Sequence, residues 1–280
     1  FFFQADHGIR DRSPSRGLGD VYKRQLLTYE ESNKIAILTL NRPNQQNSLS
    51  SDLMRELISK LDEIKNNKNI KVVTLFANGK NFCAGHDLKE LKIDKSEKRF
   101  KQIFELCSDL MLRIIKLPKP VIAGVHGIAT AAGCQLVATC DLAIASNFSK
   151  FATPGVNIGL FCSTPMVAVS RNINRKQTME MLLMGDFIDP IKAKEIGLIN
   201  RIVKEKDLKE ETLKIARIIA SKSTATVAIG KEAFYKQLEM GIEDAYKYTS
   251  KVMSSNMLQQ DAQEGISAFI ENRDPIWSDN

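Results

Sequence analysis

The sequence predicts an α/β core followed by an all-helical C-terminal region. Up to residue 203, segments with the pattern of strands alternate with amphipathic helical segments, and from Asp207 onward every segment has helical periodicity. With 43% hydrophobic and 26% charged residues in a chain of 280, the composition is that of an ordinary globular protein. We therefore expect a core over residues 26–203 and a helical region over residues 204–280.

Residues 1–25 share neither the helical periodicity nor the strand alternation of the rest of the chain. This segment resembles the read-through translation of a sequencing adapter, so we set it aside as one would an expression scar. We expect it to make no ordered contact with the core. We also expect that any targeting peptide at this end has been replaced or lost.

In the first half of the core, strands are predicted from alternating apolar and polar residues, and helices are predicted from capping residues and turns. In chain order the pattern predicts two strands within residues 26–40 around a Ser32-Asn33 turn, a helix after the cap-type residues 50–52, a strand over 70–76, a small-residue turn over 82–88, an exposed charged loop over 92–99, and a long amphipathic helix that ends before Pro118.

The central stretch, residues 121–159, is the most informative part of the chain. An apolar strand over 121–125 is followed by residues 127–133, which carry almost no side-chain bulk, and then by a short helix over 134–139. The first N–H groups of such a helix have no partner within it, and they are suited to hold a developing negative charge. Tight packing of a helix on a strand would explain the small residues equally well.

The remainder reads as helices with one further strand. We expect a helix over 178–184, a helix that ends at Gly197, a strand over 198–203, and helices over 207–221, 224–239, 242–257 and 261–272.

Composition narrows the possible partners. The net charge of +7 favours acidic ligands, but no block of Lys and Arg is interleaved with aromatic residues, so nucleic-acid binding is poorly supported. The five cysteines lack metal-site spacing and suggest free thiols in a reducing compartment, and we expect no metal site. No apolar run approaches the roughly 18 residues of a membrane span.

Five sequence blocks, in order and in register, resemble the crotonase (enoyl-CoA hydratase/isomerase) superfamily over residues 26–277: LNRPNQQNSLS, AGHDLKEL, AAGCQLVATCD, FATPGVNIGL and MGDFIDPIKAKEIGLINRIV. The resemblance implies a crotonase-like spiral of ββα units with C-terminal helices packed on it or on a neighbour. It also implies homotrimers or dimers of trimers, a mitochondrial location, and an acyl-coenzyme A thioester as ligand or substrate rather than a bound cofactor.

The resemblance also assigns roles to residues. The backbone N–H groups of His86 and Ala132 would form an oxyanion hole for the thioester oxygen, and the loop over 44–46 would lie along the adenine and pantetheine of CoA. Arg273 stands beside Asn272, which occupies the position where the family often places a phosphate-binding Lys. The ligand contacts implied in this way are Asn44, Gln45, Gln46, Ala84, His86, Asp87, Leu88, Ala132, Gly133 and Arg273.

The same resemblance locates a chemical departure. Hydratases of this family use two Glu residues, one to activate water and one to protonate carbon, and this chain has Gln135 and Gly155 at those positions. Neither can exchange a proton at neutral pH. We therefore expect an acyl-CoA-binding protein of fatty-acid metabolism with little or no hydratase activity. Another crotonase-type reaction (isomerisation, hydrolysis, decarboxylation or weak hydration) and RNA binding stay open as alternatives.

Individual side chains near the two turns have competing interpretations. The imidazole of His86 titrates near neutrality, although its backbone N–H is the expected contribution. Asp87 is expected to cap the following helix rather than to abstract a proton. Cys134 and Cys162 have no basic partner nearby in the sequence, and we expect them to be buried, inert thiols.

Overall fold

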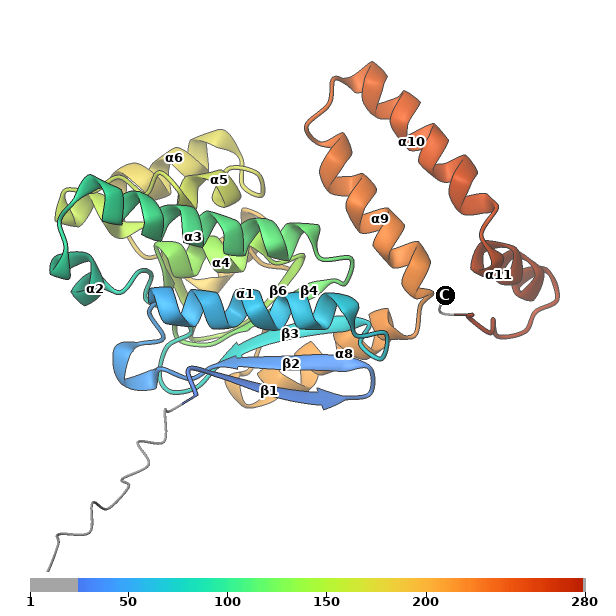
Figure 1. Cartoon of the computed structure of the whole chain (residues 1–280), viewed down its shortest axis with the longest axis horizontal. Coiled ribbons are helices and arrows are strands. Elements are labelled where there is room, and N and C mark those ends of the chain that lie inside the picture. The colour runs from blue at the N-terminus through green and yellow to red at the C-terminus, as the bar shows by residue number, and fades with distance from the viewer. Residues whose placement is uncertain (1–24, 279–280) are drawn as a thin grey trace, which may run out of the picture.

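The structure is a computed structural model that describes residues 25–278. The prediction for the N-terminal segment therefore lies, except for Gln25, outside the described residues. Within the described range the chain forms a sheet covered by helices on both faces and a helical arm that projects from one end (Figure 1).

Six strands form the main sheet, in the order β1-β2-β3-β4-β6-β8. β1 and β2 are antiparallel, and every later pairing is parallel. The strands are β1 (Leu27–Ser32), β2 (Ile35–Leu40), β3 (Val72–Ala77), β4 (Val121–Val125), β6 (Leu142–Ser146) and β8 (Arg201–Val203).

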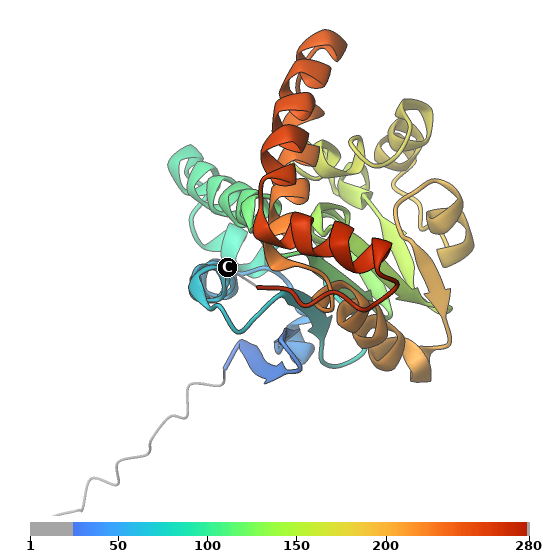
Figure 2. The same cartoon turned by 90° about the vertical axis from the view of Figure 1, so that its right-hand side faces the viewer.

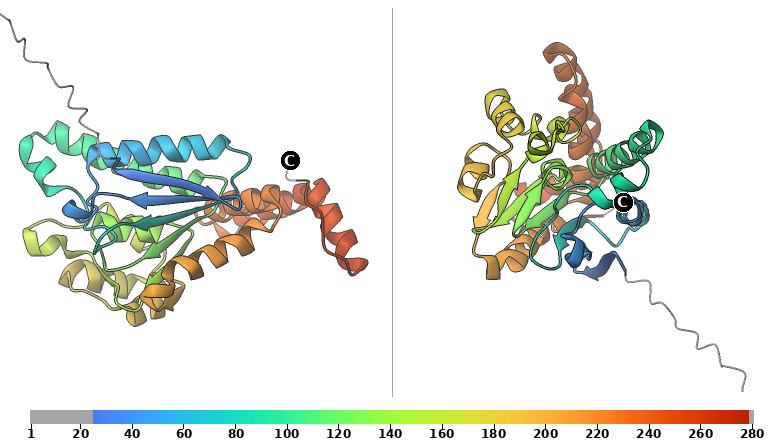
Figure 3. Two further views of the ribbon diagram at one scale, coloured as in Figure 1. Left: turned by 90° about the horizontal axis from the view of Figure 1, so that it is seen from below. Right: turned by 90° about the vertical axis from the view of Figure 1, so that its left-hand side faces the viewer.

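Both faces of this sheet are buried, which is why its inner strands read as continuous apolar runs. On one face, residues such as Leu38, Leu75 and Ala123 pack beneath α1 (Ser51–Asn66) and α3 (Glu97–Lys116). On the other face, Ile37 and Ile122 pack against α8 (Leu208–Ala220). Figure 3 shows the helices on the two sides of the strands.

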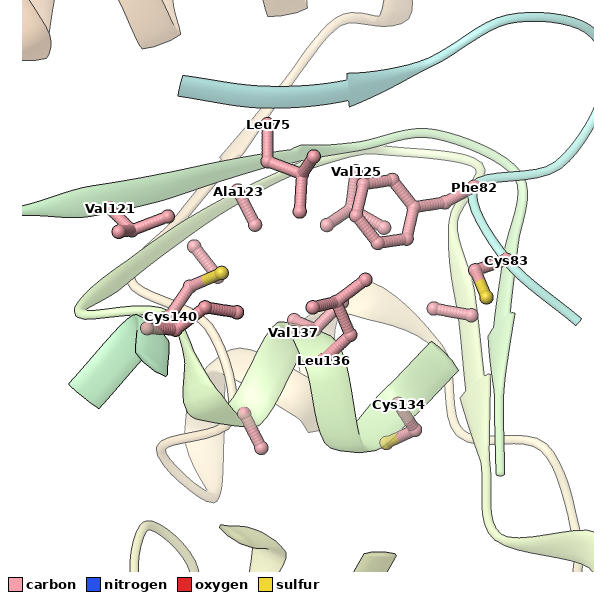
Figure 4. Packing of buried hydrophobic residues seen from close by; sticks show 14 of the residues in the cluster. Leu75, Phe82, Cys83, Val121, Ala123, Val125, Cys134, Leu136, Val137 and Cys140 are labelled. Carbon is pink, nitrogen blue, oxygen red and sulfur yellow. The ribbon is translucent and has the colours of Figure 1, made fainter. Parts of the chain in front are cut away.

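A second, two-stranded sheet pairs β5 (Ile128–Thr130) with β7 (Lys150–Ala152). Between the strands of that pair the chain forms α4 (Ala132–Thr139), whose residues are all buried. Leu136 and Val137 point from α4 towards Val125 and Phe82 (Figure 4). The short helix thus lies inside the molecule, where small and apolar residues are needed.

The remaining core elements are short. They are η1 (Pro43–Gln45), α2 (Leu88–Ile93), η2 (Pro154–Ile158), α5 (Pro165–Val169), α6 (Arg175–Met184), α7 (Pro190–Glu195) and η3 (Glu205–Asp207). Among the described residues, no helix combines the length and the apolarity needed to cross a lipid bilayer.

The C-terminal arm consists of α9 (Thr224–Gln237), α10 (Ile242–Met257) and α11 (Gln260–Ile270). It extends away from the body of the molecule (Figure 2), and within it only Ala233, Asp261 and Ala268 are buried. Because α8, which lies beyond residue 204, packs on the sheet, the arm begins only after the loop at residues 221–223. The predicted domain boundary itself stays a prediction.

A largely buried ion pair ties the arm to the core. The Lys231 Nζ of α9 lies 2.7 Å from the Asp141 Oδ2 and donates to the carbonyls of Ile114 and Lys119 at 2.9 and 3.1 Å. Asp141 also accepts from the Tyr235 hydroxyl at 2.9 Å and from the Val121 N–H at 2.7 Å. The Lys231–Asp141–Tyr235 latch therefore joins α9 to the end of α3, the start of β4 and the loop between α4 and β6.

The α/β core followed by helices is confirmed, and most predicted elements lie within a few residues of their observed bounds. The exposed loop predicted over 92–99 was wrong in extent, because only residues 94–96 separate α2 from α3. Ser96 starts α3 one turn earlier by accepting a hydrogen bond from the Arg99 N–H at 3.3 Å. Arg99 also pairs with Glu90 at 2.5 Å, so this charged stretch is held by α2.

Replacing Lys231 with Met is expected to lower the free energy of unfolding by up to about 3–5 kcal/mol, because the largely buried Asp141 carboxylate loses its cation. The matched control is Lys247→Met, which removes an exposed pair with Glu243 and should cost less than about 1 kcal/mol. Urea denaturation of both variants measures the difference. Equal small losses would contradict a stabilising role for the latch.

Candidate functional site

Two turns dock through their backbones at one end of α4. The Cys83 N–H donates to the Ile128 carbonyl at 3.0 Å, and the Thr130 N–H donates back to the Cys83 carbonyl at 3.0 Å. Gly133, in the first turn of α4, lies directly against that carbonyl, since a Cβ added there would be 2.1 Å from the Cys83 oxygen. This close approach explains the small residues that the sequence places here.

The docking brings two backbone donors together. The Cβ position of Gly85 lies 3.5 Å from the Ala132 nitrogen, so by covalent geometry the His86 and Ala132 nitrogens are within about 7 Å of each other. Neither N–H donates to an acceptor among residues 25–278. Two neighbouring, unpaired amides are what an oxyanion needs.

The backbone of Ala131, directly before α4, is strained. Its φ of 50° and ψ of −118° are rare for a residue with a side chain, and its N–H donates to the Ala152 carbonyl at 3.0 Å. Such conformations cost about 1–3 kcal/mol and persist when the surroundings fix them. Here they set the direction in which the chain enters the helix.

The loop over Pro43–Gln45 and Gln46 lies beside the first turn. The Ala84 N–H donates to the Gln46 carbonyl at 3.0 Å, and Asn47, which is fully buried, holds the loop by donating to the carbonyls of Asn78 and Asn81 at 2.8 Å. The side chains of Asn44 and Gln45 are exposed. The structure thus brings the predicted loop next to Ala84 and His86.

Asp87 caps α2. Its carboxylate accepts from the Lys89 N–H at 3.1 Å and pairs with Arg42 at 2.8 Å. Burial alone would raise the pKa of Asp87, but the hydrogen bond and charge of Arg42 hold it below its ordinary value. An ionised carboxylate committed to a cap and an ion pair is a poor proton acceptor, in agreement with the predicted capping role.

His86 directs its ring towards α3. The ring packs edge-to-face on Phe104, with centroids 5.3 Å apart, and both ring nitrogens are buried without a hydrogen-bond partner among the described residues. Burial lowers the pKa of His86, while the nearby Leu49 carbonyl and the charge of Glu90 act in the opposite direction. The net result is a neutral imidazole at pH 7.

Gln135 is the fourth residue of α4 and is 3% exposed. Its Oε1 is 3.9 Å from the Cys107 Sγ of α3, so its side chain also faces that helix. Gly155 is buried, and a Cβ there would lie 2.6 Å from the Leu160 carbonyl oxygen and 2.9 Å from the Cys162 Sγ. The chain itself therefore fills the space beside residue 155.

The buried thiols are not suited to act as nucleophiles. Burial raises the pKa of Cys134 to about 12, and it also raises the pKa of Cys162. Thiols that stay protonated are weak nucleophiles, in agreement with the inert role expected. No cluster of three or more potential metal-ligating side chains occurs within residues 25–278.

Arg273 is not brought together with the two turns. It follows α11 in the chain and pairs with Glu264 of that helix and with Glu271, both at 2.6 Å. Figure 1 shows α11 at the end of the molecule opposite α2. Its predicted contact with a CoA phosphate is therefore not made within one chain and stays a prediction.

A groove of about 420 Å³ includes Asp87 in its lining. Its lining residues are Leu26, Arg42, Ser50, Asp52, Asp87, Lys89, Glu90, Ile93 and Arg99. Arg42 and Arg99 are paired with carboxylates, whereas Lys89 forms no ion pair with the described residues. The sequence analysis missed Lys89, although its place in AGHDLKEL, on the first turn after His86, was a usable signal. Leu88 beside it is 52% exposed.

Comparisons with known proteins give consistent matches over most of the chain. Residues 30–280 match the family model of enoyl-CoA hydratase/isomerase. The chain is 46% identical over 241 residues to human mitochondrial enoyl-CoA hydratase domain-containing protein 3, covering 86% of this chain and 80% of that protein. Its mouse counterpart is 44% identical over 260 residues, covering 93% and 87%.

Solved structures show the same similarity. The crystal structure of human enoyl Coenzyme A hydratase domain-containing protein 3 superposes with a TM-score of 0.88 at 44% identity, over 90% of this chain and all of that one. An enoyl-CoA hydratase of Mycobacterium smegmatis also gives 0.88, at 47% identity, over 90% of this chain and 98% of that one. The predicted crotonase-like spiral is thus confirmed.

Replacing Gly133 with Ala is expected to destabilise the protein by at least about 1–3 kcal/mol, because the new methyl group meets a backbone carbonyl that cannot turn away. Gly230→Ala is the matched control, since Gly230 is also helical but has no atom within 4 Å of its Cβ position. That change should stabilise by about 0.5–1 kcal/mol. Thermal unfolding of both variants checks the contrast, and a Gly133→Ala protein as stable as the parent would refute the docking geometry.

The buried His86 ring predicts a pH-dependent stability. Because its folded pKa lies below the ordinary value of 6.5, the unfolded chain takes up a proton first as the pH falls. The contribution of the neutral His86 ring to the free energy of unfolding is therefore complete above pH 6.5. It is lost as the pH drops towards the pKa of the ring in the folded protein. Between about pH 7.5 and 5.5, the melting temperature should fall more for the parent than for His86→Phe. The same fall in both proteins would contradict this.

Proposed function

This chain belongs to the enoyl-CoA hydratase/isomerase family, and from that premise we propose that it binds an acyl-CoA thioester without hydrating it. The single observation that carries the proposal is the pair of backbone N–H groups at His86 and Ala132, neither of which has an acceptor within residues 25–278. At the start of a buried helix, such donors favour a thioester oxygen that gains negative charge. The names of the relatives, which include enoyl-CoA hydratases, are consistent with a CoA thioester ligand.

The missing acid and base are the reason to propose binding rather than hydration. Hydration needs one group to activate water and one to protonate carbon, and Gln135 and Gly155 supply neither. The loss at residue 155 is also steric, because the Leu160 carbonyl and the Cys162 thiol occupy the space that a longer side chain would need. Asp87, the carboxylate that follows His86 in the sequence, is engaged by Arg42.

The groove lined by Asp87 and Lys89 is where we propose that the CoA moiety lies. Lys89 is a cation without an ionic partner among the described residues, and a phosphate group would provide one. The loop at residues 44–46 is hydrogen-bonded to the same turn at Ala84, so we propose that the pantetheine lies along the outer side of that loop. The acyl group would then extend inward from His86 towards α3.

We also propose a homotrimer or a dimer of trimers, with the arm as part of the contact. The arm exposes large apolar side chains, among them Ile242, Tyr246, Leu258 and Phe269, which are 70–84% exposed in the single chain. Surfaces of this kind are characteristic of interfaces between proteins. Because Arg273 lies on the arm, its contact with a CoA phosphate would come from a neighbouring copy.

The physiological setting is proposed from the relatives. Several of them are named as mitochondrial proteins, so we propose a mitochondrial location and a role in fatty-acid metabolism. An enzyme that uses only an oxyanion hole, such as an isomerase or a thioester hydrolase, is the alternative that the same two amides would support.

We expect butyryl-CoA at about 100 times its dissociation constant to stabilise the folded protein by about 2.7 kcal/mol. For a chain of this size that is a rise in melting temperature of at least about 5 °C. With crotonyl-CoA, the loss of enoyl absorbance should be at least about 10²-fold slower than the typical enzymatic rates of roughly 1–10³ per second, because both proton-transfer groups are missing.

Ala132→Pro is the matched variant, since it removes one amide donor at a helix position that tolerates Pro. It should remain folded by circular dichroism and lose most of the stabilisation by butyryl-CoA. No stabilisation of the parent would refute acyl-CoA binding. Hydration by the parent at an ordinary enzymatic rate would refute the proposed lack of activity.

A further inference from the structure

The short helix α2 turns a face of mixed apolar and basic side chains to solvent. The residues of this outer face, all of them exposed, are Leu88, Lys89, Lys92 and Ile93. At about 100° per residue they fall within an arc of about 140° around the helix. The most exposed of the apolar pair is Ile93, at 84%. A single exposed apolar residue needs no explanation, whereas two that alternate with lysines on one helix face make an amphipathic surface.

The opposite side of α2 fixes this orientation. The Glu90 carboxylate accepts a hydrogen bond from the Ser51 N–H at 2.8 Å and pairs with Arg99 at 2.5 Å. Leu91, the next residue, packs against the main hydrophobic core. Because these two side chains hold α2 from the inside, the fold itself directs the outer face to solvent. Figure 1 shows α2 at the edge of the molecule, next to the start of α3.

Positive charge continues from α2 into α3. Residues 88–101 contain six Lys and Arg and three Asp and Glu residues, a net charge of +3, whereas the whole chain carries +7. Of the acids, Glu90 is already paired and Glu97 is exposed. The Asp94 carboxylate accepts from the Ser96 N–H at 2.8 Å. The lysines of this stretch that form no ion pair with the described residues are Lys89, Lys92, Lys95 and Lys98.

We propose that this surface, the outer face of α2 together with Lys95 and Lys98, docks reversibly on an anionic lipid bilayer. Lysines near such a bilayer are attracted to its phosphates, and apolar side chains beside them enter the boundary between headgroups and acyl chains. With only two apolar side chains the contact is weak, so it places the molecule on the bilayer without anchoring it. Because Lys89 and Ile93 also line the groove beside Asp87, a docked molecule holds that groove close to the lipid. Docking of this kind needs no acyl-CoA and is therefore separate from the proposed function.

A lipid surface fits this face better than a protein does. A stable protein interface buries about 800 Å² on each partner, around an apolar centre from which Lys is depleted. Here lysines separate the two apolar side chains, Leu88 and Ile93. Lysines can lay their methylene stems beside apolar groups while their ammonium groups reach the headgroup phosphates. The arm, which exposes more large apolar side chains, is the better surface for a protein contact.

The test is co-sedimentation with vesicles of phosphatidylcholine, alone or with about 30 mol% phosphatidylglycerol, at low salt and without acyl-CoA. The parent protein should bind the anionic vesicles at least about 10-fold more strongly, and added salt should weaken that binding. A triple variant, Lys92→Glu with Lys95→Glu and Lys98→Glu, should lose at least about 10-fold in the partition coefficient. Ile93→Ser removes the more exposed apolar side chain and should lose at least about 3-fold.

The matched charge control carries Lys204→Glu, Lys206→Glu and Lys209→Glu, at exposed lysines around η3 and the start of α8. The matched apolar control is Ile191→Ser on α7, where the isoleucine is 71% exposed. Both controls should bind the anionic vesicles within about 2-fold of the parent. If the triple variant does not fold by circular dichroism, Lys95→Glu, between the two helices, carries the same comparison.

Equal binding of the parent to both kinds of vesicle, or binding to neither, overturns the proposed docking. An equal loss in the charge control also overturns it, because the net charge of the protein rather than this face would then decide binding. If Ile93→Ser binds as tightly as the parent, the attraction is one that any polyanion such as RNA would share, and docking on a bilayer is overturned. Each of these outcomes leaves acyl-CoA binding standing, because the stabilisation by butyryl-CoA is measured without lipid.

Discussion

The contact between Gly133 and the Cys83 carbonyl is the constraint on which the rest of the site depends. A Cβ at residue 133 would lie 2.1 Å from that oxygen, so the two turns can meet only if residue 133, in the first turn of the helix, is glycine. Their approach buries α4 completely and leaves the N–H groups of His86 and Ala132 without acceptors among the described residues. Backbone donors fixed in this way need no reorganisation when a ligand oxygen arrives.

Charged side chains lie on one side of the site and neutral polar side chains lie on the other. On the outer side, Arg42 pairs with Asp87 and Arg99 pairs with Glu90 along a groove that also holds Lys89. On the inner side, beneath α3, the polar groups are the neutral His86 ring and the Gln135 amide. This division suits a ligand with phosphates at one end and an uncharged acyl group at the other. The two ends of α4 are also linked to different surfaces, since Asp141, two residues after its C-terminal end, holds Lys231 of the arm.

Much of the fold and the meeting of the two turns could be predicted from the sequence. The features that could not be predicted have physical reasons. The small residues 127–133 and the turn at 84–88 indicated a close backbone contact because few other roles require so little side-chain bulk. The Ser96 cap was missed because charged residues around it masked the start of a helix.

The closed space beside Gly155 depends on Leu160 and Cys162, which approach it only through the fold. The position of the His86 ring, which has no hydrogen-bond partner among the described residues, likewise depends on its packing against Phe104. Arg273 was placed by resemblance alone, and a sequence cannot say that it lies at the far end of the chain's own fold.

The central claim is that the two turns polarise a thioester carbonyl, and the carbon-13 resonance of that carbonyl tests it most directly. Butyryl-CoA labelled at the thioester carbon can be titrated with the protein and followed by NMR. Hydrogen bonds from the His86 and Ala132 amides should withdraw electron density from this carbon, so the bound signal should move downfield of the signal of free ligand. A saturated complex whose carbonyl resonates at the position of the free thioester would contradict the account.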